Sequence, residues 1–156
     1  MHPPGCTTGI LDGSDSVEYL ISPNVGEPLK PLARIVSGGE LSRIMLAIKS
    51  ILIDKDKISA MIFDEIDTGI GGDTANAIAA KIATIAKKHQ VICITHLAQI
   101  AAVAHHHLRV QKAVSGGNTH VSVTALDSVE RQSEIARMLS GKITESTLEH
   151  AKELMQ

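Results

Sequence analysis

The sequence predicts an α/β fold with a mainly parallel β-sheet, an antiparallel hairpin and flanking helices. Residues 58–63 and 91–94 are short apolar runs typical of strands, and residues 73–88 between them place their apolar side chains on one side of a helix. A strand, a helix and a second strand in this order form a βαβ unit with parallel strands and a right-handed crossover. Because both runs are almost continuously apolar, we expect both strands to be buried on both faces of the sheet.

Further elements are predicted around this unit. Residues 17–21 are predicted to form a strand. Residues 22–31 hold three prolines and a glycine, so they are predicted to form a loop. A helix should open at Ser37 and bury one apolar face, formed by Leu41, Ile44, Met45, Ile48 and Leu52. Three more helices are predicted over residues 97–103, 129–140 and 145–155, the second of them with Gly141 as its C-cap.

An antiparallel hairpin is predicted between the helices of residues 97–103 and 129–140. Residues 107–112 and 119–124 alternate apolar and polar side chains around a glycine turn at residues 115–118. We expect this hairpin to lie on the edge of the parallel sheet, with His107 able to pair with His120 across its strands. The three adjacent histidines at 105–107 have no spacing that suits zinc, so we predict no metal there.

Composition limits the class of function. The 156 residues suit one domain, with residues 1–12 as an irregular arm and residues 13–156 as the folded lobe. The net charge is −2, no long run of Lys or Arg occurs, and aromatic residues make up 1%, so this chain is not expected to provide the main DNA surface. No apolar stretch reaches the ~18–20 residues of a membrane span, and two isolated cysteines suit a reduced cytoplasmic protein.

Side chains suited to phosphoryl chemistry follow the two central strands. Asp64 and Glu65 come directly after the first strand, and His96 follows the second. Since the carboxyl ends of parallel strands meet at one edge of a sheet, these three side chains should lie near one another. Asp64 could hold Mg²⁺, usually through water, Glu65 could orient or deprotonate an attacking water, and His96 could donate to a phosphate oxygen.

The motif Ser37-Gly38-Gly39-Glu40 has two interpretations. Ser-x-x-Glu before an apolar helix is a capping box, which satisfies free N–H groups at the helix N-terminus and needs no ligand. A capping box does not require the two glycines, and they bare the backbone where the helix dipole attracts anions. The sequence therefore also indicates a helix N-terminus that binds phosphate.

Together these motifs resemble those of ABC-type ATPases, in that family's order. The matching segments are residues 37–43 (signature motif), 61–65 (Walker B strand), Asp67 with the glycines after it (D-loop) and Thr95-His96 (switch histidine). Any one of them is a weak signal, but four with fitting spacing are specific.

The resemblance is to the SMC-like branch of chromosome-maintenance ATPases. Glu40 stands where transporter cassettes usually have glutamine. Residues 24–33, 63–70 and 94–101 are similar to a DNA repair member of that branch, and the similarity covers roughly Gly13 to the end of the chain.

In that family two heads pair with two ATP molecules between them. The resemblance implies that Ser37, Gly38 and Gly39, with Glu40 beside them, contact the γ-phosphate of ATP held by the other head. It also implies that Asp67 communicates across the interface between the heads.

The resemblance implies that the remaining residues act in the hydrolysis of ATP. Asp64 would support Mg²⁺, Glu65 would position the hydrolytic water, and His96 would sense the γ-phosphate. Head engagement, hydrolysis and release would serve repair of DNA double-strand breaks. DNA would be bound through the full-length protein, in the cytoplasm at the nucleoid.

A P-loop, G-x-x-x-x-G-K-[ST], does not occur in the 156 residues, where the only Gly-Lys pair is Gly141-Lys142. Sustained heptads of a coiled coil are absent as well. Both gaps fit the C-terminal lobe of a head whose P-loop lies in an N-terminal Walker A lobe, so we expect no ATP hydrolysis by this chain alone. A missing partner lobe should also leave an exposed sheet edge and an apolar patch.

Two other functions fit parts of this pattern. A metal-dependent hydrolase of a small phosphorylated substrate would use Asp64, Glu65, Asp67 and His96, and would turn over without an added lobe. A non-catalytic module that pairs with other heads would bind a P-loop lobe and have no activity of its own.

Overall fold

The computed structural model describes residues 17–22, 26–34, 37–55 and 57–156. The chain divides into two units, one ending at Val36 and one beginning at Ser37. The arm predicted for residues 1–12, together with Cys6, lies outside the described residues. No helix among the described residues is long and apolar enough to cross a membrane.

The first unit contains a small antiparallel pair. Strand β1 (Leu20–Ile21) pairs with β2 (Lys30–Pro31), and a short 3₁₀ helix, η1 (Leu32–Arg34), follows. The strand predicted over residues 17–21 is therefore confined to its last two residues. The loop predicted over residues 22–31 is wrong at its end, where Lys30 and Pro31 pair with β1; an edge strand tolerates a proline there.

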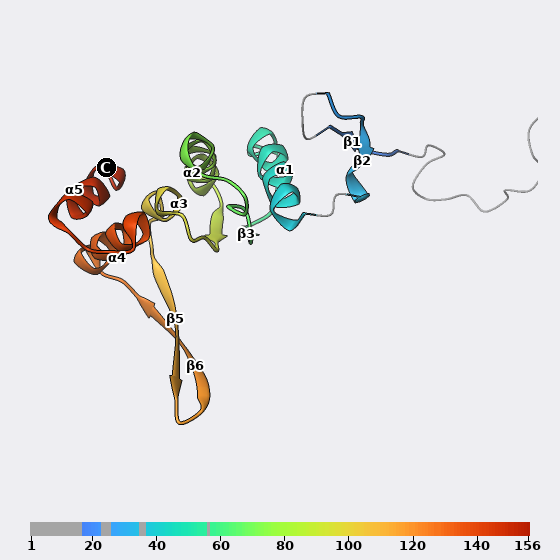
Figure 1. Ribbon diagram of the computed structural model, residues 1–156. Coiled ribbons are helices and arrows are strands. Elements are labelled where there is room, and N and C mark those ends of the chain that lie inside the picture. The colour runs from blue at the N-terminus through green and yellow to red at the C-terminus, as the bar shows by residue number, and fades with distance from the viewer. Residues whose placement is uncertain (1–16, 23–25, 35–36, 56) are drawn as a thin grey trace, which may run out of the picture. The chain divides into compact units, whose positions relative to one another are not determined.

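The second unit contains the predicted βαβ arrangement. Helix α1 (Gly38–Ile51) leads into β3 (Ala60–Phe63), α2 (Gly72–Ala86), β4 (Gln90–Cys93) and the short α3 (Ala98–Ala102). Strands β3 and β4 are parallel and in register from the pair Ala60 and Gln90 to the pair Phe63 and Cys93, which confirms the prediction. Figure 1 shows α2 between α1 and α3, and α2 packs against both.

The core of this unit is aliphatic. The apolar face predicted for α2 is confirmed, and it packs against β3 and the turn that follows it. The buried residues of this cluster are Leu46, Met61, Phe63, Ile66, Ile78, Ala79, Ile82, Ile85 and Ile100. Cys93 packs against the cluster, and burial raises the pKa of its thiol to about 11, so the thiol stays protonated and inert at neutral pH.

The β3–β4 sheet is covered on one face only, which corrects the prediction that both faces are buried. Met61 and Phe63 point into the core, whereas Ile62 is 69% exposed. Ile92 on β4 and Ile94 directly after it are exposed as well. Side chains alternate between the faces of a strand, and α2 supplies a layer for only one of them. The predicted exposed apolar patch is present.

The apolar face predicted for α1 is also wrong. Leu46, which lies off that face, is the buried apolar side chain of α1, with 3% of its surface exposed. Most of the predicted face is exposed, including Met45, Leu41, Ile48 and Leu52. The periodicity of α1 thus marks a surface that residues 37–55 and 57–156 cover only in part.

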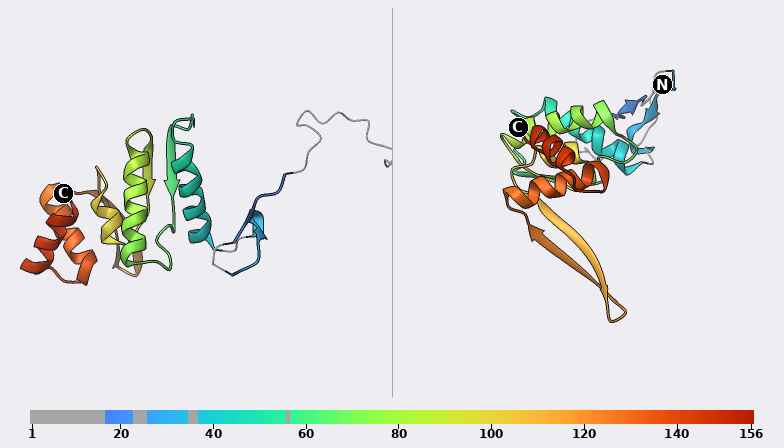
Figure 2. Two further views of the ribbon diagram at one scale, coloured as in Figure 1. Left: turned by 90° about the horizontal axis from the view of Figure 1, so that it is seen from above. Right: turned by 60° about the vertical axis from the view of Figure 1, so that its left-hand side comes forward.

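A long hairpin forms a sheet of its own. Strands β5 (Leu108–Ser115) and β6 (Asn118–Ala125) are antiparallel and joined by Gly116 and Gly117, whose φ angles of 58° and 79° suit a tight hairpin turn. The hairpin projects away from the helices of its unit (Figures 1 and 2) and does not pair with β3 or β4, so its predicted place on the sheet edge is wrong. His120 lies opposite Ala113, so the predicted pairing with His107 is also wrong.

Two capped helices complete the chain. Helix α4 (Ser128–Ser140) begins with a capping box between Asp127 and Glu130 and ends at Gly141, which has a φ of 75° as predicted for its C-cap. Helix α5 (Glu145–Leu154) packs against α4 and α3. The small cluster between these three helices consists of Ala98, Ala102, Ile135, Ala136 and Ala151.

We predict that Ile85→Ala lowers the free energy of unfolding by about 2–5 kcal/mol, because a fully buried isoleucine leaves a cavity when truncated. The matched control is Ile51→Ala at the end of α1, where the side chain is 81% exposed and the cost should stay below about 0.5 kcal/mol. Urea unfolding followed by circular dichroism measures both. Equal costs would contradict the assignment of the core to the α2 side of the sheet.

Candidate functional site

Three segments meet at the carboxyl edge of the β3–β4 pair. They are the N-terminus of α1, the turn of residues 64–68 after β3, and the turn of residues 95–97 after β4. The Ser42 hydroxyl donates to the Asp64 carbonyl at 2.7 Å, and the Thr95 hydroxyl donates to the Asp67 carboxylate at 2.5 Å. The structure therefore brings together the residues predicted for the site.

The helix N-terminus has the predicted cap. Ser37 is the N-cap of α1, and its hydroxyl accepts a hydrogen bond from the Glu40 amide at 3.4 Å. Glu40 lies in the first turn, where a carboxylate interacts favourably with the helix dipole. This is the Ser37 half of the predicted capping box.

The two glycines of α1 are needed for close packing. A Cβ atom on Gly38 would lie 2.5 Å from the Glu65 carboxylate oxygen, and one on Gly39 would lie 2.7 Å from the Glu65 carbonyl. A side chain at Gly39 would push the helix away from the turn after β3, whereas one at Gly38 would require the Glu65 side chain to move. The sequence explained the glycines by anion binding, and this contact adds a second reason for them.

Glu65 has an unusual backbone. Its φ of 58° makes it the one non-glycine residue with a positive φ in the described part of the chain. For an L-residue this conformation costs about 1–2 kcal/mol and persists only where neighbours enforce it. Its carbonyl accepts from the Thr68 amide at 3.1 Å, and its carboxylate lies at the positive end of α1.

Asp64 offers an exposed carboxylate at the end of β3. One of its oxygens accepts from the Glu65 amide at 2.9 Å, which leaves its other oxygen open towards solvent. Mg²⁺ in phosphate sites is often held by one or two carboxylates, water and the phosphates themselves. Asp64 therefore fits the role of a single Mg²⁺ ligand.

Asp67 is buried, with 3% of its surface exposed, and its carboxylate points towards the turn after β4. One oxygen accepts hydrogen bonds from the Thr95 hydroxyl at 2.5 Å and from the His96 amide at 2.7 Å. The same oxygen lies 2.9 Å from His96 Nδ1. Burial alone would raise the pKa of Asp67, but these partners outweigh it and hold the pKa below its ordinary value. The carboxylate is thus engaged within its own chain.

His96 is oriented by this contact. The Asp67 carboxylate lies next to Nδ1, which favours a proton on that nitrogen and leaves Nε2 free for a ligand. The side chain is 71% exposed, so Nε2 is accessible at the edge of the sheet. The Thr95 hydroxyl also accepts from the Leu97 amide at 3.0 Å, which fixes the turn that carries the imidazole.

Residue types and spacing alone did not identify Thr95, Ser42 or Arg43 as structural supports of this site. Each lies beside a recognised motif residue, and that adjacency was the only available signal. Their roles depend on contacts between segments 22–28 residues apart in sequence, which motif spacing does not report.

A cluster of ligands for a metal is not formed. No three His, Cys, Asp or Glu side chains within residues 17–22, 26–34, 37–55 and 57–156 are grouped so that they could hold one ion. The histidines at 105–107 are among the residues covered by this finding. The arrangement gives no support to a hydrolase that would gather Asp64, Glu65, Asp67 and His96 around a metal.

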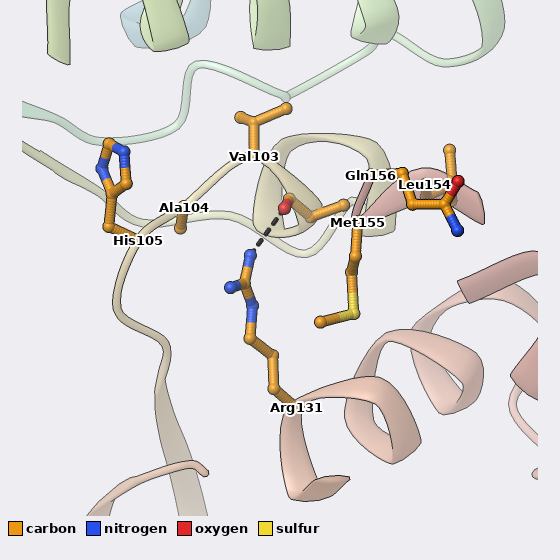
Figure 3. Close-up of a pocket in the computed structure, with 8 residues that line it drawn as sticks. Val103, Ala104, His105, Arg131, Leu154, Met155 and Gln156 are labelled. Atoms are coloured by element: carbon orange, nitrogen blue, oxygen red, sulfur yellow. Dashed lines mark hydrogen bonds between the residues drawn. The ribbon is translucent and has the colours of Figure 1, made fainter. Parts of the chain in front are cut away.

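A shallow pocket lies elsewhere in the unit. It is an open hollow of about 460 Å³ between α3, the start of α4 and the end of α5, and none of the predicted site residues lines it (Figure 3). Arg131 donates there to the Ala102 carbonyl at 2.6 Å (Figure 3) and to the Ala101 carbonyl at 3.4 Å. The guanidinium caps the C-terminus of α3, which is a structural role.

Comparison with known proteins gives a consistent set of relatives, although no family model matches the sequence. The DNA repair protein RecN of Treponema pallidum is 51% identical over 145 residues, which cover 92% of this chain and 25% of that protein. RecN of Bacillus subtilis is 50% identical over 145 residues, and RecN of Deinococcus radiodurans is 49% identical over 143, with the same coverage. The chain spans about a quarter of the length of these relatives.

A solved SMC ATPase chain has a more distant likeness. It aligns with a TM-score of 0.49 and 23% identity, covering 76% of this chain and 70% of that chain. A likeness at this level carries no weight for a functional role.

We predict that Asp67→Asn lowers the free energy of unfolding at pH 7 by about 1.5–3 kcal/mol, because a buried carboxylate loses its charge-assisted hydrogen bonds. The control Asp64→Asn, at an exposed carboxylate, should cost less than about 1 kcal/mol. Urea titrations of the chain and its variants measure both changes.

The cost of Asp67→Asn should depend on pH. Because the folded-state pKa lies below the ordinary value of 3.8, the stabilisation is present above that value and is lost as the pH falls through the lowered pKa. The two proteins should therefore converge in stability in strong acid. A difference that persists unchanged there would show that the carboxylate charge is not its source.

Proposed function

We propose that this chain, which belongs to the RecN family over the quarter of a RecN protein that it matches, is the C-terminal lobe of an ATPase head. The supporting observation is the convergence of the α1 N-terminus, Asp64-Glu65 and His96 at one edge of the parallel strands, in a sequence without a P-loop. The lobe would supply the residues that act on the γ-phosphate. An N-terminal Walker A lobe would hold the rest of the nucleotide.

The helix N-terminus would serve the opposite head. Ser37, Gly38 and Gly39, with Glu40 in the first turn, would present backbone N–H groups to the γ-phosphate of ATP bound by the other head. Two heads would then enclose two nucleotides between them.

The turn after β3 would act on the nucleotide of its own head. Asp64 would support Mg²⁺, which neutralises charge on the phosphate oxygens when bound. Glu65 would orient the attacking water and accept its proton. The left-handed backbone at this residue sets the direction in which its side chain leaves the turn.

His96 would donate an Nε2–H hydrogen bond to a γ-phosphate oxygen, which requires a proton on Nε2 in addition to the Nδ1 proton that faces Asp67. The interaction with Asp67 keeps the Nδ1 proton in place and orients the ring for this role. We therefore assign Asp67 to the support of His96. Its buried position fits this role better than the interface role that the motif implied.

The exposed apolar surface would be the contact with the Walker A lobe. It comprises Ile62, Ile92 and Ile94 on the open face of the sheet and the uncovered side of α1. Burying a side chain of this type contributes about 1.5–3 kcal/mol, so a few of them suffice for a stable contact. Both outer edges of the β3–β4 pair also lack a strand among the described residues.

The cellular role would be DNA repair, because the relatives are DNA repair proteins. DNA would be engaged by the whole protein, since this segment has a net charge of −2 and no concentrated basic run. The head would thus work in the cytoplasm, at the nucleoid.

We predict that the chain alone does not hydrolyse ATP, and that mixing it with a Walker A lobe from a RecN relative restores hydrolysis. Glu65→Gln should reduce the activity of the mixture by a factor of about 10²–10⁴, the typical contribution of a general base. Phosphate release over time measures the rate. Glu149→Gln, on the exposed face of α5, is the matched control and should leave the rate unchanged.

Three other results would redirect the proposal. Turnover by the chain alone that Glu65→Gln abolishes would favour the metal-dependent hydrolase. Binding of the Walker A lobe without turnover would favour the non-catalytic pairing module. Failure of the two lobes to associate would contradict the proposed role.

We predict that Ile62→Asp weakens association with the Walker A lobe at least tenfold, because a carboxylate would be buried in an apolar contact. Calorimetric titration measures the affinity. Val129→Asp is the control, since Val129 is 70% exposed at the start of α4, away from the sheet. Both variants should keep the unfolding temperature of the chain, and equal affinities would exclude this face as the docking surface.

A further inference from the structure

We propose that Arg43 is a positioning residue that holds the turn of residues 64–68 in the shape that places Glu65. This inference rests on the proposed function, because the role of the turn in hydrolysis comes from there. It adds a residue whose action would pass entirely through the backbone of the turn.

Arg43 contacts the turn at two carbonyls. Its Nη1 atom donates to the Ile66 carbonyl at 3.2 Å and to the Thr68 carbonyl at 3.0 Å. A guanidinium nitrogen of this type carries two hydrogens, so one atom can serve both acceptors. The adjacent Ser42 hydroxyl donates to the Asp64 carbonyl at 2.7 Å. Two successive side chains of α1 thus hold the carbonyls of residues 64, 66 and 68.

The turn needs this support from outside. Glu65 has a φ of 58°, which an L-residue adopts only where its surroundings enforce it. On the inner side, fully buried Ile66 and nearly buried Asp67 anchor the turn. On the outer side, its own backbone contributes the bonds from Thr68 to Glu65 and from Ile70 to Asp67, the latter at 3.4 Å. Arg43 and Ser42 add side-chain contacts from α1.

Gly39 makes room for the guanidinium. A Cβ on Gly39 would lie 3.1 Å from Arg43 Nη1 and 3.1 Å from Thr68 Cβ, in addition to its clash with the Glu65 carbonyl. A side chain there would force Arg43 Nη1 to shift by a few tenths of an ångström. The absence of a side chain at Gly39 therefore leaves space for Arg43, in addition to baring the backbone for a phosphate.

This arrangement links two functions within one lobe. The helix whose N-cap is Ser37, a residue proposed to contact phosphate, is the same helix that holds the turn carrying Glu65. A shift of α1 on engagement with a second head would move the turn with it. Arg43 would thereby couple head engagement to the placement of the general base.

The first part of the test uses the chain by itself and does not depend on ATP. Hydrogen exchange of the amides of residues 65–70 is measured for the unmodified chain, Arg43→Ala, Arg43→Lys and the control Arg137→Ala on α4. Arg43→Ala should speed exchange in this segment about tenfold, because it removes charge-assisted hydrogen bonds. Arg43→Lys, which keeps the charge but not the planar geometry, should restore part of the protection. Arg137→Ala should leave residues 65–70 unchanged.

The second part measures ATP hydrolysis in complex with the Walker A lobe. Arg43→Ala should lower kcat about tenfold while the KM for ATP stays within about twofold, because the other lobe holds most of the nucleotide. Arg43→Lys should recover part of kcat, and Arg137→Ala should match the unmodified complex. A general loss of structure would instead raise exchange throughout residues 37–156.

The outcomes separate this inference from the proposed function. Unchanged exchange at residues 65–70 in Arg43→Ala would overturn the inference. Faster exchange with an unchanged kcat would also overturn it, because the turn would not then govern catalysis. An inactive unmodified complex would overturn the proposed function and with it the catalytic half of the inference, while the exchange data would still decide whether Arg43 holds the turn.

Discussion

The buried carboxylate of Asp67 is the contact on which the geometry of the site depends. It joins the turn after β3 to the turn after β4 by accepting from the Thr95 hydroxyl and the His96 amide. The parallel pairing of the strands brings the two turns to one edge, but pairing alone does not orient their side chains. A buried carboxylate is tolerated only when donors compensate its desolvation. The same bonds that compensate Asp67 therefore also orient the imidazole of His96.

Local sequence predicted the elements better than it predicted their surroundings. The periodicity of α2, the glycine turn of the hairpin and the Gly141 cap each depend on contacts within a few residues, and each is confirmed. The burial of α1 and of the second sheet face depends on what packs over them. An apolar stripe indicates that a helix or strand face can be buried, but it does not identify the element that packs over it. That is why Met45 and Ile62 were predicted to be buried and are exposed.

The placement of the candidate residues at one edge was predictable from the sequence, and their connections were less so. Parallel topology correctly placed Asp64, Glu65 and His96 at one edge, because the carboxyl ends of parallel strands must meet there. The inward orientation of Asp67 was not predictable, because a turn residue can face either side. The contacts of Ser42 and Arg43 with the turn also escaped prediction, because they depend on where a helix crosses a loop in space.

On the proposed function, Glu65 would be in place before the Walker A lobe binds. Its backbone is the one described non-glycine position with a positive φ, a local conflict that proteins tolerate mainly at functional sites. The conflict is held by elements of the lobe itself: the glycines of α1 lie against the residue, and buried Ile66 and Asp67 fix the turn behind it. None of these supports comes from the open apolar face. A docking lobe would therefore bring nucleotide to a carboxylate already in place, and would not have to build the turn that carries it.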